Sequence, residues 1–196
     1  GTDAFQEADV IGITTPITKW NYQITDANEI PKIIAKAFHI AQTGRPGPVV
    51  IDITKDVQFQ EFDFKYNKIK SINSYQPTTH PNPNQIKKAA QLLNNSIRPL
   101  ILAGHGISIS GAQKELETLV KKSNIPVACT LWGLSNIKSN SKNYVGMLGM
   151  HGNVGPNILT NKADVIMAIG MRFDDRVTGN LKTYAKQAKI IHIDID

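Results

Sequence analysis

Two glycine-containing segments hold the residues of this chain that are best suited to binding a phosphorylated ligand. One is Gly149-Met150-His151-Gly152, and the other is the run from Gly170 to Gly179, which carries two arginines and two aspartates. Backbone N–H groups in glycine turns bind anions. An arginine can donate two parallel hydrogen bonds to a phosphate, and carboxylates can accept from sugar hydroxyls. The two segments together predict a site for a phosphorylated cofactor.

Each candidate motif also has a structural alternative that the sequence leaves open. Gly104-His105-Gly106 is either a ligand-binding turn or a tight strand-to-helix turn that needs a positive φ. The charges of the 170–179 run either contact a ligand or form salt bridges at a subunit contact. Asp194 and Asp196 either accept hydrogen bonds from a sugar or a ring, or solvate the end of a strand.

The elements that must position these residues begin with an α/β unit. Asp26 starts a capping-box pattern, and the apolar face that follows, from Ile30 to Ala41, predicts a helix that Gly44 ends. The apolar run from Val49 to Ile53 predicts a strand covered on both faces. From about residue 58 to residue 84 the periodicity fails and polar residues dominate, which predicts a surface linker.

Past the linker, apolar runs alternate with helical patterns. The expected strands are 99–103, 126–130, 165–169 and 190–194, and the expected helices are 84–94, 112–122 and 153–161. Parallel neighbours need a crossover, so this order predicts an α/β fold with a parallel, doubly wound sheet. The glycine motifs follow the expected strands, at the carboxyl edge where such sheets bind ligands.

Composition narrows the class of protein further. The 196 residues are 41% hydrophobic and 19% charged, which indicates a globular chain of one or two domains. The net charge is +6, but the lysines are scattered, so nucleic acid is not expected as a partner. No apolar run approaches the roughly 18 residues of a membrane span, so a membrane is not expected either. The single cysteine, Cys129, lies in an apolar run and is expected to be buried. The five histidines lack the spacing of metal ligands, so no metal site is expected.

Motifs spread over nearly the whole chain resemble those of acetolactate synthase, the catalytic subunit of acetohydroxyacid synthase. The motifs are Gly1-Thr2-Asp3-Ala4-Phe5-Gln6-Glu7, Ile17-Thr18-Lys19, Gly44-Arg45-Pro46-Gly47-Pro48-Val49, Met147 to Gly152 and Gly170 to Gly179. The resemblance implies a thiamine-diphosphate enzyme of branched-chain amino acid biosynthesis. Such an enzyme decarboxylates pyruvate and condenses the hydroxyethyl group with a second 2-oxo acid, which gives acetolactate or acetohydroxybutyrate.

The resemblance places this chain as an internal segment of such an enzyme. Residues 1–57 would be the end of an N-terminal pyrimidine-binding domain, 58–84 a linker, and 85–196 most of a Rossmann-like central domain that binds FAD. The ligands of thiamine diphosphate and Mg²⁺ would lie mostly outside the segment, so the segment alone is expected to be inactive. The implied partners are the two 2-oxo acids, further catalytic subunits in a homodimer or homotetramer, and a small regulatory subunit. The implied compartment is the plastid stroma or the bacterial cytoplasm.

The resemblance also assigns roles to single residues. Phe5, Gln6 and Lys55 are the catalytic candidates beside the substrate channel, with dimer-interface packing as the alternative for the first two. Ala4, Met150, Asp175 and Arg176 would line the entrance at which sulfonylurea-type herbicides bind. The residues that would contact FAD are Arg45, Gly104, Gly106, Thr130, Leu131, Leu148, Gly149, Met150, His151, Gly170, Arg172, Asp174, Arg176, Val177, Asp194 and Ile195.

Four positions depart from the family pattern. His105 stands where glycine is frequent, Trp132 where methionine is usual, Ser135 where glycine is usual, and Thr54 where proline precedes the channel lysine. The first bears on how closely the backbone approaches FAD, and the others bear on herbicide and substrate fit. Two other functions stay open: another thiamine-diphosphate decarboxylase or carboligase, with ADP or no nucleotide in its central domain, and a non-catalytic nucleotide-binding or regulatory module.

Overall fold

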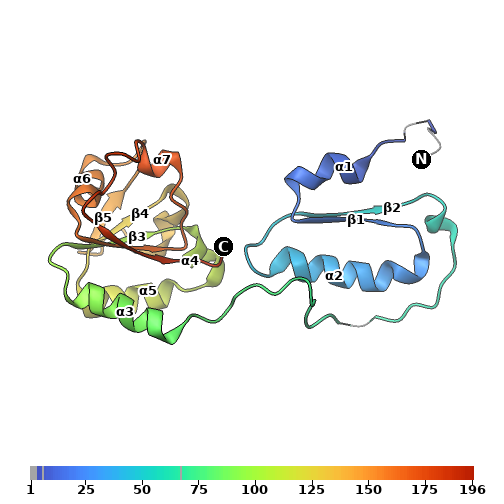
Figure 1. Ribbon diagram of the computed structural model, residues 1–196, viewed down its shortest axis with the longest axis horizontal. Coiled ribbons are helices and arrows are strands. Elements are labelled where there is room, and N and C mark those ends of the chain that lie inside the picture. Colours follow the sequence, from blue (N-terminus) through green and yellow to red (C-terminus); the bar gives the residue numbers. More distant parts are fainter. Residues whose placement is uncertain (1–3, 6, 67) are drawn as a thin grey trace. The chain divides into compact units, whose positions relative to one another are not determined.

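The structure is a computed structural model that describes residues 4–5, 7–66 and 68–196, and it consists of two compact units. One unit comprises Gly1–His80 together with Ile195–Asp196, and the other comprises Pro81–Asp194. Each unit combines helices with a parallel sheet (Figure 1). This arrangement confirms the predicted α/β class.

The first unit is built on two parallel strands. β1 (Trp20–Ile24) pairs with β2 (Val49–Ile53), and α2 (Ile30–Gln42) packs against both strands. Its buried core includes Ile24, Ala27, Ile33 and Val57. The shorter elements are α1 (Val10–Thr14), η1 (Thr15–Ile17), η2 (Ala27–Glu29) and η3 (Val57–Phe59).

The predicted helix and strand of this unit are confirmed, and local chemistry explains the ends of the helix. Asp26 caps the 3-10 turn that leads into α2, because its side chain accepts a hydrogen bond from Asn28 N at 2.9 Å. At the other end, Lys19 Nζ donates to the carbonyl oxygen of Ile40 at 2.7 Å and also to that of Thr43. A lysine at this position satisfies the last helix carbonyls and complements the negative end of the helix dipole.

The second unit contains a five-stranded parallel sheet in the order β5-β4-β3-β6-β7. The strands are β3 (Pro99–Ala103), β4 (Val127–Cys129), β5 (Tyr144–Met147), β6 (Val165–Ile169) and β7 (Lys189–Ile193). The helices are α3 (Pro83–Asn94), α4 (His105–Ser110), α5 (Gln113–Ser123), η4 (Leu131–Asn136), α6 (Val154–Lys162) and α7 (Asp175–Thr178). After β3, the chain adds β4 and β5 on one side of β3 and then β6 and β7 on the other side. This order confirms the predicted doubly wound sheet.

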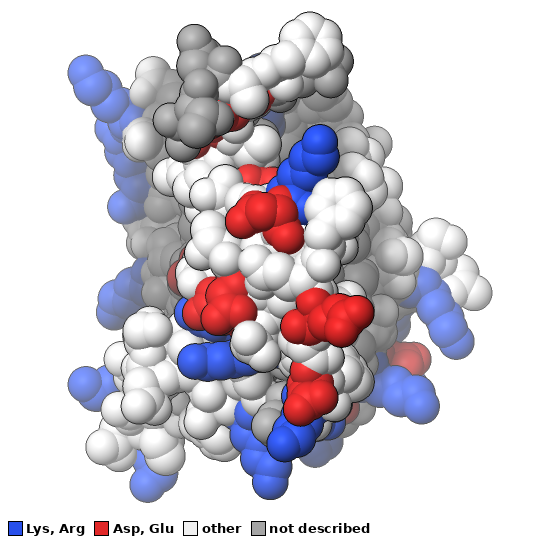
Figure 2. Space-filling view, turned by 90° about the vertical axis from the view of Figure 1, so that its right-hand side faces the viewer, with Lys and Arg blue, Asp and Glu red and all other residues white. Residues whose placement is uncertain are grey.

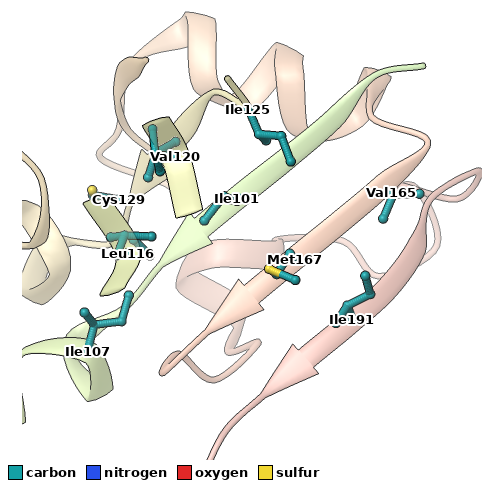
Figure 3. Packing of buried hydrophobic residues seen from close by; sticks show 11 residues of the cluster. Ile101, Ile107, Leu116, Val120, Ile125, Cys129, Val165, Met167 and Ile191 are labelled. Carbon is teal, nitrogen blue, oxygen red and sulfur yellow. The ribbon is translucent and has the colours of Figure 1, made fainter. Parts of the chain in front are cut away.

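Two hydrophobic cores cover the two faces of this sheet. Alternate strand residues point to opposite faces. Ile101, Cys129 and Met167 pack with Leu116 and Val120 of α5 on one face (Figure 3). The core on the other face contains Leu100, Leu102, Ala128, Leu148, Ala163, Ile166, Ala168, Met171 and Ala185. A sheet covered on both faces explains why its strands read as continuous apolar runs in the sequence.

Cys129 lies inside the first of these cores, as the sequence predicts. Its exposed fraction is 0%, and burial raises the pKa of its thiol to about 12. The thiolate is the nucleophilic form of cysteine. This thiol is therefore a packing group rather than a reactive one at neutral pH.

The predicted linker, residues 58–84, has little regular structure among its described residues. η3 ends at Phe59, an isolated antiparallel bridge joins Ile72 and Tyr75, and α3 begins at Pro83. The predicted boundaries, 1–57, 58–84 and 85–196, stay a prediction. Within the described part of the chain, no helix is long and apolar enough to cross a membrane.

The surface in Figure 2 carries both signs of charge. Asp and Glu side chains lie in the middle of this face, and Lys and Arg side chains lie both beside them and around its margins. The net charge of +6 is therefore not gathered into one basic patch on this face. A groove for nucleic acid needs such a continuous basic surface.

Asp164 ties the start of β6 to the start of β3, and we expect Asp164→Asn to destabilise the second unit at neutral pH. Its carboxylate accepts hydrogen bonds from Ile97 N at 2.7 Å and Arg98 N at 2.9 Å. These bonds hold the pKa of the Asp164 carboxyl below its ordinary value, and the bond from Ile97 N has the larger effect. An amide can accept only one of the two bonds, so the loss should be about 1–2 kcal/mol.

The pH dependence of that loss has a definite sign. A carboxyl with a lowered folded pKa contributes its full stabilisation above its unfolded pKa of about 4 and loses it as the pH falls through the folded value. We therefore expect the free energies of unfolding of the variant and the native protein to differ less at pH 3 than at pH 7. Urea unfolding at both pH values measures this difference. The exposed Glu115→Gln in α5 serves as the control, and an equal pH response of both variants would contradict the assignment.

Candidate functional site

The predicted cofactor residues of the second unit gather along one edge of its sheet. All five strands are parallel, so their carboxyl ends meet at the same edge. Backbone bonds join neighbouring strand ends there, from Thr130 N to Ala103 O at 3.0 Å and from Leu148 N to Cys129 O at 3.0 Å. The loops that follow β3, β4, β5 and β6 therefore form one continuous rim.

Gly104, Gly106 and Gly170 let two of these loops touch backbone to backbone. Gly106 N donates to Gly170 O at 2.8 Å, and a Cβ at position 104 would lie 2.3 Å from that same oxygen. The alternative of a turn that needs a positive φ does not hold for Gly104 or Gly106: Gly104 has φ −109°, Gly106 has no positive φ, and at this contact the positive φ of +59° belongs to Gly170. Glycine is needed after β3 because of close packing rather than backbone handedness.

Residues 170–179 extend across the top of the sheet, and we name this segment the strap. It leaves β6, yet Met150 N beyond β5 donates to Arg176 O at 2.7 Å. β3 and β4 lie between those two strands, so the strap spans three strand spacings, about 14 Å. Gly149 has φ +96°, and a Cβ there would lie 2.8 Å from Arg176 O. The two segments singled out in the sequence thus meet in the structure.

Asp174 organises the charged part of the strap. One carboxylate oxygen, Oδ1, accepts from Arg176 N at 3.1 Å and from Val177 N at 3.2 Å, which caps α7. The other oxygen, Oδ2, accepts from Arg172 Nε at 3.0 Å. The side chain of Arg172 is 73% exposed, and an exposed pair of this kind contributes little to stability. Arg172 therefore lies at the rim with one bond to Asp174 and with most of its surface facing solvent.

Apolar side chains stand exposed at the same rim. Leu131, the first residue of η4, is 65% exposed, and Met150 is 59% exposed. Phe173 and Val177 of the strap pack on the core face that includes Leu100 and Leu102. The rim thus combines an arginine, accessible apolar groups and closely packed glycine backbone, and this combination suits a ligand with both a charged and a flat apolar part.

A hollow of about 350 Å³ lies between α6 and the strap. Its lining includes Gly149, Asn157, Thr160, Arg176 and Tyr184. Among the residues that the structure describes, Tyr184 Oη is the one buried side-chain polar atom without a hydrogen-bond partner, and burial raises the pKa of this phenol to about 12. Tyr184 thus borders the hollow with its hydroxyl oxygen buried.

The remaining candidates lie elsewhere. Phe5 is 93% exposed, Lys55 is exposed just beyond β2, and Arg45 is exposed in the turn after α2, all in the first unit. Gln6 lies outside the described residues. Asp194, in contrast, follows β7 of the second unit at the same carboxyl edge of the sheet, with Oδ2 3.8 Å from His192 Nε2. The structure thus brings together the candidates on the rim of the second unit, and the roles of the others stay predictions.

Sequence reasoning did not identify Asn136 as a residue of this site. Its side chain is 3% exposed, donates from Nδ2 to Gly104 O at 2.7 Å, and accepts at Oδ1 from Ser108 Oγ at 2.6 Å. It therefore fixes η4 to the loop after β3. The sequence does not predict the role of Asn136, because nothing in a single sequence distinguishes a buried asparagine from one at the surface.

The fold and the rim agree with the comparison of the chain with known families. Residues 86–196 match the family described as the thiamine pyrophosphate enzyme, central domain. The chain therefore belongs to the thiamine pyrophosphate enzyme family.

The chain is also similar along its whole length to several acetolactate synthases. The whole chain is 51% identical to a probable acetolactate synthase large subunit from Methanococcus aeolicus. It is 45% and 46% identical to acetolactate synthase large subunits from Corynebacterium glutamicum and Buchnera aphidicola. It covers 33%, 31% and 35% of these three relatives, so it spans about a third of their length. These matches confirm the resemblance drawn from the sequence motifs.

Proposed function

We propose that this chain is part of an acetolactate synthase and that its second unit holds FAD. The whole-chain identity of 42–51% to proteins of that name supports the activity. Pyruvate is then the first substrate, and a second 2-oxo acid accepts the hydroxyethyl group. Thiamine diphosphate supplies the decarboxylation and carbon–carbon bond chemistry when it is bound.

The contact between the strap and the loop after β5 is the observation that carries the FAD proposal. Met150 N donates to Arg176 O at 2.7 Å, so the two glycine segments form one rim at the carboxyl ends of the strands. Doubly wound sheets bind dinucleotides in this place. Arg172 would bind the pyrophosphate, and the glycine-rich loops would let the ligand approach backbone N–H groups.

The residues of this chain would orient FAD and shield it, and we assign it no net redox step in this reaction. Leu131 and Met150 would pack on its flat parts, since both are exposed and apolar. Asp174 would hold Arg172 and cap α7, rather than contact the ligand with both oxygens. We place thiamine diphosphate and Mg²⁺ mostly on parts of the protein beyond these residues, because the family match is to a central domain.

The finer assignments follow from the same proposal. Phe5, Gln6 and Lys55 would border the substrate channel, and Met150, Asp175 and Arg176 with Ala4 would border a sulfonylurea-binding entrance. The protein would assemble as a homodimer or homotetramer of catalytic subunits, with a small regulatory subunit as a further partner. The expected compartment is the bacterial cytoplasm or the plastid stroma, and relatives such as that of Corynebacterium glutamicum favour a prokaryotic source.

Arg172→Gln should weaken FAD binding by the full-length protein about 10-fold to 100-fold. The variant removes a charge-assisted hydrogen bond to phosphate, and such bonds contribute roughly 1.5–3 kcal/mol. Titration of apoprotein with FAD, followed by flavin fluorescence, measures the effect.

Arg98→Gln is the matched control for this titration. Arg98 is also exposed but precedes β3, at the opposite edge of the sheet. Equal losses in both variants would show that the arginine acts through net charge alone. Failure of the native protein to bind FAD would refute the assignment of this cofactor.

The activity is tested on the full-length protein with pyruvate, thiamine diphosphate, Mg²⁺ and FAD. Acetolactate should form, whereas the 196-residue segment alone should form none. Acetolactate from the segment would contradict our placement of the thiamine site. Nucleotide binding without any product from the full-length protein would instead favour a regulatory module, and decarboxylation without carbon–carbon bond formation would favour another thiamine-diphosphate enzyme.

A further inference from the structure

His105 and Trp132 form a ring pair at the rim of the second unit. Their ring centroids are 5.7 Å apart with an angle of 48° between the ring planes, and His105 Nδ1 lies 3.1 Å from Trp132 O. His105 is the first residue of α4, after β3, and Trp132 lies in η4, after β4. The pair therefore comes from two neighbouring strand ends of one sheet.

The backbone that carries this pair is rigidly held. Asn136 Nδ2 donates to Gly104 O at 2.7 Å, which joins η4 to the residue before His105. Gly133 lies so close to β3 that a Cβ there would be 2.2 Å from Ala103 O. The backbone of this turn thus already packs directly against β3.

Above this fixed backbone, the Trp132 side chain is 74% exposed. Tryptophan is rarely left this accessible without a partner, because its ring has a large apolar area. Leu131 beside it is 65% exposed. A flat aromatic group on a rigid backbone is preorganised, so covering it costs little conformational entropy.

The location of the pair favours a planar ligand ring as its partner. It stands where the carboxyl ends of β3 and β4 meet, which is the ligand-binding edge of a doubly wound sheet. α4 and Ile107 belong to one face of the sheet, whereas Val177 of the strap packs on the other face. Arg172 and the ring pair therefore border the carboxyl edge from opposite faces, with the strand ends between them.

We propose that His105 and Trp132 are a stacking surface for a planar ring of the bound dinucleotide. This inference rests on the proposed FAD site and adds to it two ligand-contacting residues outside the predicted set. Ring stacking requires only an accessible π-face, which both the isoalloxazine and the adenine of FAD provide. The indole would supply most of the contact, and the imidazole would extend it and hold the Trp132 backbone.

The test is FAD binding to full-length apoprotein carrying Trp132→Leu, Trp132→Phe or Ile97→Ala. We expect Trp132→Leu to raise the Kd for FAD about 5-fold to 100-fold, the range for losing one stacked aromatic ring. Trp132→Phe should stay within about 3-fold of the native value, because it keeps a π-face. Ile97→Ala is the matched control, since Ile97 is 87% exposed before the start of β3, and it should leave the Kd unchanged.

Titrations with FMN and with ADP identify the stacked ring. If the isoalloxazine stacks, Trp132→Leu weakens FAD and FMN binding but not ADP binding, and it alters the absorption spectrum of bound flavin. If the adenine stacks, it weakens FAD and ADP binding but not FMN binding. Either result supports the proposal, provided that circular dichroism shows the variant to be folded.

Two results would overturn it, and they are distinguishable. If native and Trp132→Leu proteins bind FAD equally well, the ring pair is not a stacking surface although the FAD site stands. If the native protein binds no FAD, the proposed cofactor fails and the stacking inference fails with it.

Discussion

Gly170→Ala should unfold the second unit or lower its free energy of unfolding by more than about 4 kcal/mol. Gly170 has φ +59°, which an alanine tolerates only at a cost of about 1–2 kcal/mol. A Cβ there would also lie 2.7 Å from both Gly106 Cα and Ile107 N. Both neighbours are backbone, so no flexible side chain can move aside, and the loops after β3 and β6 must separate.

Gly111→Ala isolates the conformational part of this effect. Gly111 has φ +70° and ψ 20°, in the left-handed region, but nothing lies within 4 Å of its Cβ position. Chemical unfolding of this control should show a loss of only about 1–2 kcal/mol. The steric argument is wrong if the two variants lose the same stability.

Asn136→Ala should lower the free energy of unfolding by about 2–4 kcal/mol, which is large for a polar residue. The change removes the donor to Gly104 O and the acceptor of Ser108 Oγ, and it leaves the buried Gly104 carbonyl with only the longer bond from Ile107 N at 3.3 Å among the described residues. It also empties the space of a side chain that is 3% exposed. Because η4 depends on this link, FAD affinity should fall as well.

A double-mutant cycle with Ser108→Ala separates the two hydrogen bonds. Ser108→Ala alone should cost about 1 kcal/mol, since it removes one bond and leaves the amide link to Gly104. The double variant should cost less than the sum of the single losses by about 0.5–1 kcal/mol. A loss under 1 kcal/mol for Asn136→Ala would show that η4 is held by other contacts.

Strong patterns in the sequence predicted most of the fold. The apolar runs 99–103 and 165–169 coincide with β3 and β6, because strands buried on both faces leave a continuous hydrophobic signal. β1 was missed, although Trp20, Tyr22 and Ile24 alternate with polar residues in the manner of a strand. β5 was also missed because it is short and contains Gly146 at φ +111°, a residue that weakens the strand pattern.

The candidate site was predictable in its parts but not in its assembly. The glycine segments indicated ligand chemistry, and the parallel sheet indicated the edge at which they lie. The contact of Met150 with Arg176 depends on the strand order β5-β4-β3-β6-β7, in which β4 and β3 separate β5 from β6. No local sequence pattern encodes that order. The His105–Trp132 contact and the buried Asn136 also arise from tertiary structure.

The two oxygens of the Asp174 carboxylate accept hydrogen bonds from different groups, and this separation affects how the strap responds to an anion. Oδ1 holds the amides at the start of α7, a helix of one turn that would not persist alone, whereas Oδ2 holds only the Arg172 guanidinium. An incoming phosphate can therefore displace Oδ2 from Arg172 without disturbing the cap. The arginine can exchange its intramolecular partner for a ligand while the backbone beneath it keeps its shape.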